Sequence, residues 1–296
     1  MSDPSPVGPP GPPGLTNDLL APFGPLAAPH RAAVLETVAR IPQELADLAV
    51  SRPGGGSLRL TDHDVRTALA PPERPRTPTP FAWSTRTARR ALGLAAVRIV
   101  VAGKERSPAE GVRATLAEGI RLARMGDALA SPVDRWLASL PAGGLAAVQS
   151  EAVTWATRLW CALDWSAFDE RPIIGRDRWW DSPHSSLLAI RSRAEVRSIA
   201  LDPSGCPYSV HLVVLGGPRR PSIRSELSVV AMVEALHAPA SLPPGRVVGW
   251  WPDSGHVVKV DIDQAAVREG VTAIARTLAP PEGAVVPFER ETRAAA

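Results

Sequence analysis

The sequence predicts an α/β or α+β fold, in which a central mixed sheet of about five strands is flanked by helices and follows a helical N-terminal region. Two patterns support this expectation. Up to about residue 165, apolar residues recur mainly at spacings of three and four, which is typical of helices. From residue 187 onward, alternating runs typical of strands are separated by helical ones. A third observation is that 296 residues, 45% of them hydrophobic and 21% charged, can bury a substantial core.

The first 80 residues are expected to form a tail, a helical segment and a linker. Residues 1–25 are rich in proline and glycine, beginning MSDPSPVGPPGPPG, and we expect them to be a disordered tail. Residues 26–80 contain a helical pattern at about 27–50 and end in the stretch PPERPRTPTP, which is typical of a linker. The main domain is therefore expected to begin at Phe81.

Residues 81–143 predict a helical region. A helix over 84–102 would place its apolar residues on one stripe and Arg86, Arg89 and Arg90 nearly opposite. Ser107, followed by a proline and then by a glutamate three positions on, is typical of the start of the next helix.

Residues 144–280 predict an α/β core, and residues 281–296 a second disordered tail. The helix at 144–165 has the strongest apolar periodicity of the chain. The stretch YSVHLVVL at 208–215 is apolar on both faces toward its end, which predicts a central strand. The other elements expected here are strands at 187–191, 193–201, 246–251 and 256–260 and helices at 222–237 and 263–278.

Composition limits the classes of function. The formal net charge of +3 is too small to indicate a nucleic-acid binder by itself. Cys161 and Cys206 provide neither a disulfide framework nor a metal-binding set, and the six histidines show no metal-ligand spacing, so no metal or cofactor is predicted. The N-terminus lacks the pattern of a signal peptide and no apolar run approaches 18 residues, so we expect a cytoplasmic protein without a membrane partner.

The element order from residue 144, α-β-β-β-α-β, resembles the core of the PD-(D/E)XK nuclease superfamily, in particular its RecB-type nuclease domain. In this alignment RSRAEVRSIAL is the second strand and puts Glu195 at the position of the family's aspartate. The third strand, LVVLGG, puts Val213 at the second acidic position and Leu215 at the lysine, while Gly217 matches the family's final glycine.

The departures from this family concern its catalytic residues. The chemistry that the resemblance implies needs two carboxylates to hold Mg²⁺ and a lysine two positions after one of them. Lys104 and Lys259 are the only lysines among the 33 basic residues, and no D/E-x-K tripeptide occurs in the chain. The resemblance therefore implies a degenerate site, in which the vestigial carboxylates are Glu151, Glu195 and Glu226.

Arginines surround the expected position of that site. Because alternate residues of a strand share a face, Arg191, Arg193 and Arg197 are predicted to lie beside Glu195 and to hold it in ion pairs that oppose metal binding. Paired guanidinium groups also suit phosphates. The candidate nucleic-acid-binding residues are Arg86, Arg89, Arg90, Arg191, Arg193, Arg197, Arg219, Arg220 and Arg224.

Tryptophan is favoured over the other aromatic residues, with nine Trp against one Tyr and four Phe. In an extended segment, adjacent residues point to opposite sides, so the pairs Trp179–Trp180 and Trp250–Trp251 could each present one ring to a partner. The alternative is that both rings of each pair pack within the protein.

The first hypothesis for function is a catalytically inactive nuclease-like domain that binds DNA or is a structural subunit of a DNA-processing complex. The second is a protein–protein adaptor that uses the exposed rings of the Trp pairs. The third is an active metal-dependent nuclease with migrated residues, using Glu151, Glu195 and Glu226 with Mg²⁺.

Overall fold

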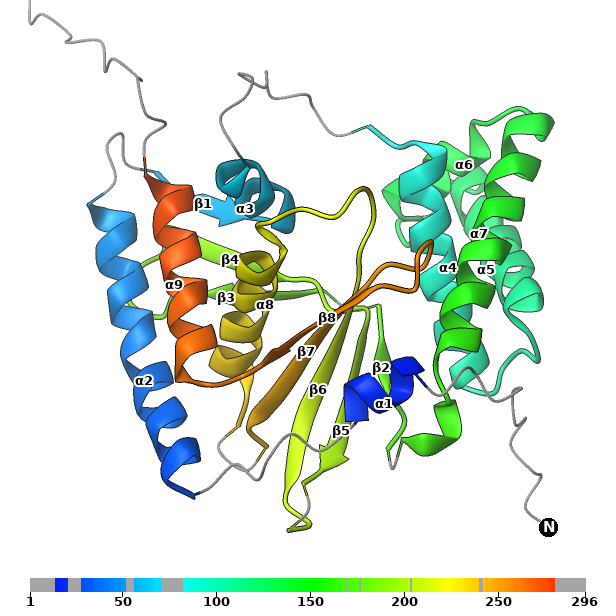
Figure 1. Cartoon of the computed structure of the whole chain (residues 1–296). Coiled ribbons are helices and arrows are strands. Elements are labelled where there is room, and N and C mark those ends of the chain that lie inside the picture. The colour runs from blue at the N-terminus through cyan, green and yellow to red at the C-terminus, as the bar shows by residue number, and fades with distance from the viewer. Residues whose placement is uncertain are drawn as a thin grey trace, which may run out of the picture.

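A five-stranded mixed sheet runs through the middle of the molecule (Figure 1). The computed structural model describes residues 14–20, 28–51, 56–70, 82–168, 170–175, 177–202, 204–239 and 242–279. The strands of this sheet, in spatial order, are β2 (Ile173–Ile174), β5 (Val196–Leu201), β6 (Pro207–Val214), β7 (Pro244–Trp250) and β8 (Val257–Asp261). β6 and β7 are parallel, and the other neighbours are antiparallel. With helices on both faces, this arrangement confirms the predicted fold class.

The sheet separates two hydrophobic cores, because successive side chains along β6 point to opposite faces of the sheet. Tyr208, Val210, Leu212 and Val214 point into one core, whereas Val213 belongs to the other. The first core is covered mainly by α4 (Thr85–Val101), α5 (Pro108–Arg124), α6 (Pro132–Ala138) and α7 (Ala142–Ala162). The second is covered mainly by α2 (Ala28–Val50), α8 (Ile223–His237) and α9 (Gln264–Leu278). A central strand that is buried on both faces is what its apolar sequence predicts.

A second, three-stranded sheet joins the N-terminal region to the rest of the molecule. Its order is β1 (Leu58–Leu60), β4 (Leu188–Ser192) and β3 (Arg178–Asp181). β1 is parallel to β4, with Leu58 opposite Leu188, and α3 (Asp62–Leu69) follows β1 directly. α2 packs against α9, and α3 contacts both α8 and α9. The N-terminal segment therefore shares a core with the C-terminal elements.

Two expectations about chain organisation need correction. Residues 14–20, expected within a disordered tail, form α1 (Gly14–Leu20), because Leu15 and Leu19 are buried in the first core. The strand predicted at 187–191 exists as β4, but it lies in the small sheet, and β2 takes the neighbouring place beside β5. Along the chain, α7 and β2 are followed by β3 and β4 of the small sheet, and only then by β5, β6, α8 and β7, so the predicted consecutive α-β-β-β-α-β order is interrupted.

Some expectations fall outside the described residues. These are the predictions of a disordered tail at residues 1–13, 21–25 and 281–296 and of a linker at 71–80. Within the part of the chain that the structure describes, no helix is both long enough and apolar enough to cross a membrane.

Candidate functional site

A cleft of about 1240 Å³ opens beyond the carboxyl end of β6. α4 and α7 form one wall, α3 and the start of α8 form the other, and the segment 213–217 lies between them. Five acidic side chains line this cleft, against nine arginines: Arg66, Arg86, Arg89, Arg90, Arg98, Arg158, Arg191, Arg193 and Arg220. Such an excess of one charge sign in a concave surface attracts anionic ligands.

Local sequence explains how α4 presents its arginines. Ser84 accepts a hydrogen bond from the backbone N–H of Thr87 and fixes the start of the helix. Arg86, Arg90 and Arg98 then recur at multiples of four residues, so that they share the face that lines the cleft. Arg86 and Arg98 are exposed, and neither has an acidic partner among the described residues.

Glu195 lies beneath the cleft and is fully engaged by donors. Its side chain is 1% exposed, and one carboxylate oxygen accepts the backbone N–H of Val214 at 2.6 Å. The other oxygen accepts Nε of Arg193 at 3.2 Å and also pairs with Arg90. Two of the three guanidinium partners expected from the sequence are thus replaced by one on α4, and a metal ion would have to displace both arginines that are present.

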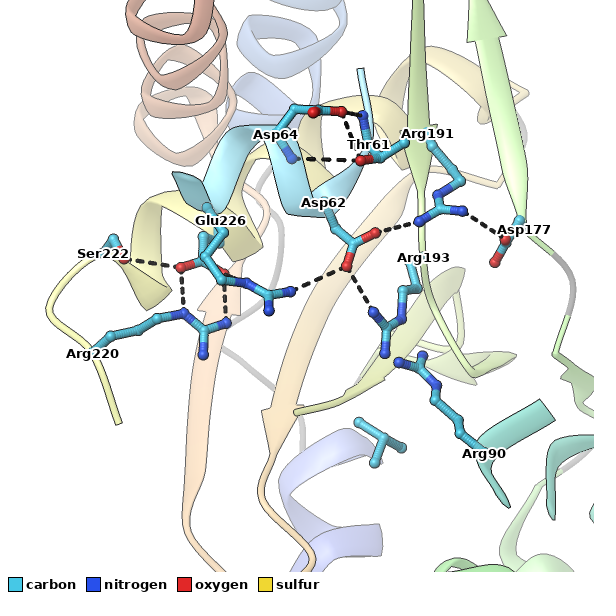
Figure 2. A network of polar contacts seen from close by, with 12 residues as sticks. Thr61, Asp62, Asp64, Arg90, Asp177, Arg191, Arg193, Arg220, Ser222 and Glu226 are labelled. Carbon is cyan, nitrogen blue, oxygen red and sulfur yellow. Dashed lines mark hydrogen bonds and ion pairs between the residues drawn. The ribbon is translucent and has the colours of Figure 1, made fainter. Parts of the chain in front are cut away.

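Asp62 is the centre of a larger arginine cluster at the other wall of the cleft (Figure 2). Thr61 and Asp64 form a capping box that begins α3 and places Asp62 at its first position. The Oδ1 atom of Asp62 accepts a hydrogen bond of 2.5 Å from Arg191. Its Oδ2 atom accepts hydrogen bonds of 2.7 Å from Arg193 and 3.2 Å from Arg66. Burial raises the pKa of Asp62, but the charges and hydrogen bonds of Arg193 and Arg191 outweigh it and hold the pKa at about 2.

The remaining carboxylates of the cleft are also bound to guanidinium groups. Glu226 of α8 receives two hydrogen bonds of 2.5 Å from Arg220, and Glu151 of α7 receives one of 3.0 Å from Arg89. Within the described residues, no group of three or more His, Cys, Asp or Glu side chains is placed to hold a metal ion. The three carboxylates of the migrated-nuclease hypothesis thus lie around one cleft, but each bonds to an arginine and they do not form a cluster.

The prediction that Arg197 lies beside Glu195 is wrong. The chain crosses from the small sheet to the large one at residues 193–195, so the alternation does not continue from β4 into β5. Arg197 is 4% exposed and donates to Glu234 of α8 at 3.0 and 2.7 Å. Because it is buried in this ion pair, Arg197 is not available to a nucleic acid.

His211 joins Arg197 and Glu234 in a buried polar network between the sheet and α8. Its Nδ1 lies 3.6 Å from Glu234. Burial is the main reason that the pKa of His211 falls to about 4, and the charge of Glu234 opposes that fall. Burial has the opposite effect on the carboxyl group of Glu234 and raises its pKa, but His211, Arg197 and a hydrogen bond from Ser192 outweigh burial and lower that pKa to about 2.

The second predicted arginine set does not converge on the cleft. Arg220 lines it, but Arg219 and Arg224 do not. Arg219 is exposed on the turn after β6, and Arg224 is an exposed residue of α8 whose Nε lies 3.8 Å from Glu269 of α9. The sequence placed these three residues together because they are close along the chain, whereas the turn and the helix direct them differently.

The tryptophan pairs are largely buried, contrary to the outward rings expected for an adaptor. Trp250 and Trp251 are 6% and 4% exposed, and Nε1 of Trp251 donates to the backbone oxygen of Gly217 at 3.1 Å. Trp180 is buried at 6%, while Trp179 is half-buried with the guanidinium of Arg59 4.4 Å from its ring centroid. These rings serve packing and the position of the 215–220 turn.

Sequence reasoning missed Asp62, Arg66, Arg98, Arg158 and Asp177 as cleft residues. The four-residue spacing of Arg86, Arg90 and Arg98 could have identified Arg98. The one local partner of Asp62, Arg66, has a spacing common on helix surfaces, and its other two partners lie 129 and 131 residues further along the chain, so no local signal marks Asp62 as a cleft residue.

The chain matches no protein-family model, no curated protein and no solved structure.

Proposed function

We propose that this chain is a catalytically inactive, nuclease-like domain that binds DNA through the arginine-lined cleft. The observation that carries the proposal is the excess of nine arginines over five acidic residues in one concave surface. Arg86 and Arg98, which have no acidic partner among the described residues, are the cations most readily available to phosphates.

The position of the cleft supports the nuclease-like part of the proposal. It lies where β6 ends, and α7, β2, β5, β6, α8 and β7, with β3 and β4 inserted after β2, resemble the element order of the nuclease core. In the alignment with that family Glu195 takes the acidic position, and its carboxylate is held by Arg90 and Arg193. A domain of this kind would retain the surface that accepts DNA while its acidic residues serve as ion-pair partners.

The spacing along α4 gives the size of the contact. Arg86 and Arg98 are twelve residues apart, and at about 1.5 Å per residue they lie about 18 Å apart along the helix axis. This length corresponds to roughly five base pairs of duplex rise. A duplex that follows α4 could therefore meet these arginines through phosphates about half a helical turn apart.

A titration of a fluorescent 20-base-pair duplex at several salt concentrations tests the proposal. We expect binding whose log K falls with log salt with a slope of about −3, because about three phosphate contacts each contribute about −0.9. Arg86→Ala/Arg98→Ala should reduce the steepness of that slope by about two and weaken binding roughly tenfold. The matched control is Arg113→Ala/Arg124→Ala, which removes two exposed charges from α5 outside the cleft.

The absence of any binding would contradict the proposal, and so would two other outcomes. Equal weakening by both double variants would show that binding follows net charge and not the cleft. Cleavage of the duplex in parallel samples with Mn²⁺ would show that the domain is an active nuclease.

A further inference from the structure

The contacts of Asp62 have the form of a bound phosphate. Three guanidinium groups from two parts of the chain, the end of β4 and α3 itself, converge on one carboxylate. Arg191 donates to one oxygen and Arg193 to the other (Figure 2), and Arg66 donates to the same oxygen as Arg193. Each arginine donates through one nitrogen to one carboxylate oxygen, and guanidinium groups bind phosphate oxygens through the same kind of charge-assisted hydrogen bond. The carboxylate thus lies where a phosphate group of a ligand would be well bound.

These arginines carry more donors and more charge than Asp62 satisfies. Three guanidinium groups face its single negative charge. Their other acidic neighbours are further away: Asp177 lies 3.4 Å from Arg191, Glu195 lies 3.2 Å from Arg193, and Glu226 lies 3.7 Å from Arg66. In addition, Nε of Arg191 and Nε of Arg66 are buried without a hydrogen-bond partner among the described residues. Buried donors normally have acceptors, and a phosphate offers more acceptor oxygens than a carboxylate.

The cluster can be reached from the cleft. The side chains of Asp62, Arg191 and Arg193 are 21%, 25% and 26% exposed, so they are partly covered without being sealed. α3 is held in place by Val65, which is 3% exposed in the second core. A rotation of the Asp62 side chain away from its partners would expose the three guanidinium groups without unfolding the sheet.

We infer that Arg66, Arg191 and Arg193 form a phosphate subsite of the cleft, and that Asp62 occupies this subsite until a phosphate of the DNA backbone displaces it. The inference rests on the proposed function, since the ligand is the DNA of the same cleft. It adds that the unbound chain is self-inhibited, because each binding event must first break the contacts of Asp62.

Asp62→Asn tests the inference, since the amide keeps the size of the side chain and removes the competing charge. We expect the duplex to bind the variant roughly fivefold to tenfold more tightly at about 100 mM salt, with a slope steeper by about one contact. Glu118→Gln is the matched control, because it removes the same charge from an ion pair with Arg121 on α5, outside the cleft. Its affinity for the duplex should equal that of the unmodified chain.

Arg86→Ala/Arg98→Ala separates this inference from the proposed function. If that variant weakens binding while Asp62→Asn binds no more tightly than the unmodified chain, the self-occupied subsite is refuted and the DNA-binding cleft stands. If neither the unmodified chain nor Asp62→Asn binds the duplex, the proposed function fails, and the inference with it. Binding by Asp62→Asn alone would support both.

A measurement on the unmodified protein keeps the inference testable if Asp62→Asn does not fold. Displacement of Asp62 removes the ion pairs of the first turn of α3, so hydrogen exchange in residues 62–69 should become faster when the duplex is added. Exchange in α5 should not change. Slower or unchanged exchange in residues 62–69 at saturating duplex would overturn the inference.

Discussion

Replacement of Glu195 by glutamine distinguishes an ion-pair acceptor from a metal ligand. The substitution keeps the shape of the side chain and removes its charge. If Glu195 acts as the structure shows, as the shared acceptor of Arg90, Arg193 and the Val214 N–H, the loss of charge should destabilise the fold. If it were instead the ligand of a catalytic metal, its loss should abolish metal binding at little cost in stability.

The magnitude follows from the contacts. Glutamine has one acceptor oxygen, so it can accept a hydrogen bond from the Val214 N–H or from the arginines, but not from both. Its NH₂ group then faces the other donor without an acceptor between them. An unsatisfied buried group costs about 1–3 kcal/mol, and the loss of one partner from a buried ion pair costs about 3–5 kcal/mol. Because Arg193 keeps Asp62 and Arg90 is partly exposed, we expect the lower end, about 3 kcal/mol.

Urea unfolding at pH 7, with and without Mn²⁺, measures both quantities. With a slope of about 3 kcal/mol per molar urea, the midpoint of Glu195→Gln should fall by about 1 M, and Mn²⁺ should leave both midpoints unchanged. Glu118→Gln should unfold at the same midpoint as the unmodified chain. The reasoning would be refuted by a variant as stable as the original that has lost a Mn²⁺-induced increase in midpoint.

Two further predictions concern the packing behind the cleft. Between pH 6.5 and about 4 the unfolded chain takes up a proton on His211 that the folded chain does not, so this contribution to stability is complete above pH 6.5 and decreases toward pH 4. Between pH 7 and 4.5, the free energy of unfolding obtained from urea midpoints should therefore fall by about 2 kcal/mol less in His211→Gln than in the unmodified chain. An equal fall in both proteins would contradict the burial of a neutral imidazole. A Cβ on Gly270 of α9 would lie 2.5 Å from the backbone oxygen of Ser228 on α8, so Gly270→Ala should destabilise the fold by about 2–3 kcal/mol. Gly143→Ala at the start of α7, where a Cβ meets nothing within 4 Å, should instead stabilise it by up to about 1 kcal/mol in the same urea assay, and a loss of stability in both variants would argue against the close approach of α8 and α9.

Local signals in the sequence predicted local structure well. Ser84 and Ser107 begin the helices that their patterns indicate, and the apolar run at 208–215 is the central strand β6. The division of residues 188–201 between two sheets was not predictable, because the residue alternation looks continuous across the break at 193–195. Trp251 was misjudged for a related reason: it follows the end of β7, and its backbone N–H bonds to His256 across a turn, where strand alternation no longer applies.

The candidate site shows the same division between local and distant information. The arginine face of α4 could be predicted from helical spacing, and Glu195 was correctly expected to be held by arginine. The second arginine bound to Glu195 could not be predicted, because Arg90 lies on a different element more than a hundred residues earlier. Ion pairs across the cleft depend on how helices and sheets pack, which no short stretch of sequence records.

The pairing of β1 with β4 also sets the order in which the molecule can fold. Leu58 must find Leu188, roughly 130 residues later, so the small sheet has a high contact order and closes a long loop. At about 5–20 residues per second, a ribosome needs several seconds to make the partner strand after β1 has emerged. Asp62 lies just after β1 and pairs with Arg191 in β4 and with Arg193 just beyond it. The wall of the cleft that holds Asp62 is therefore assembled late, after most of the chain has been synthesised.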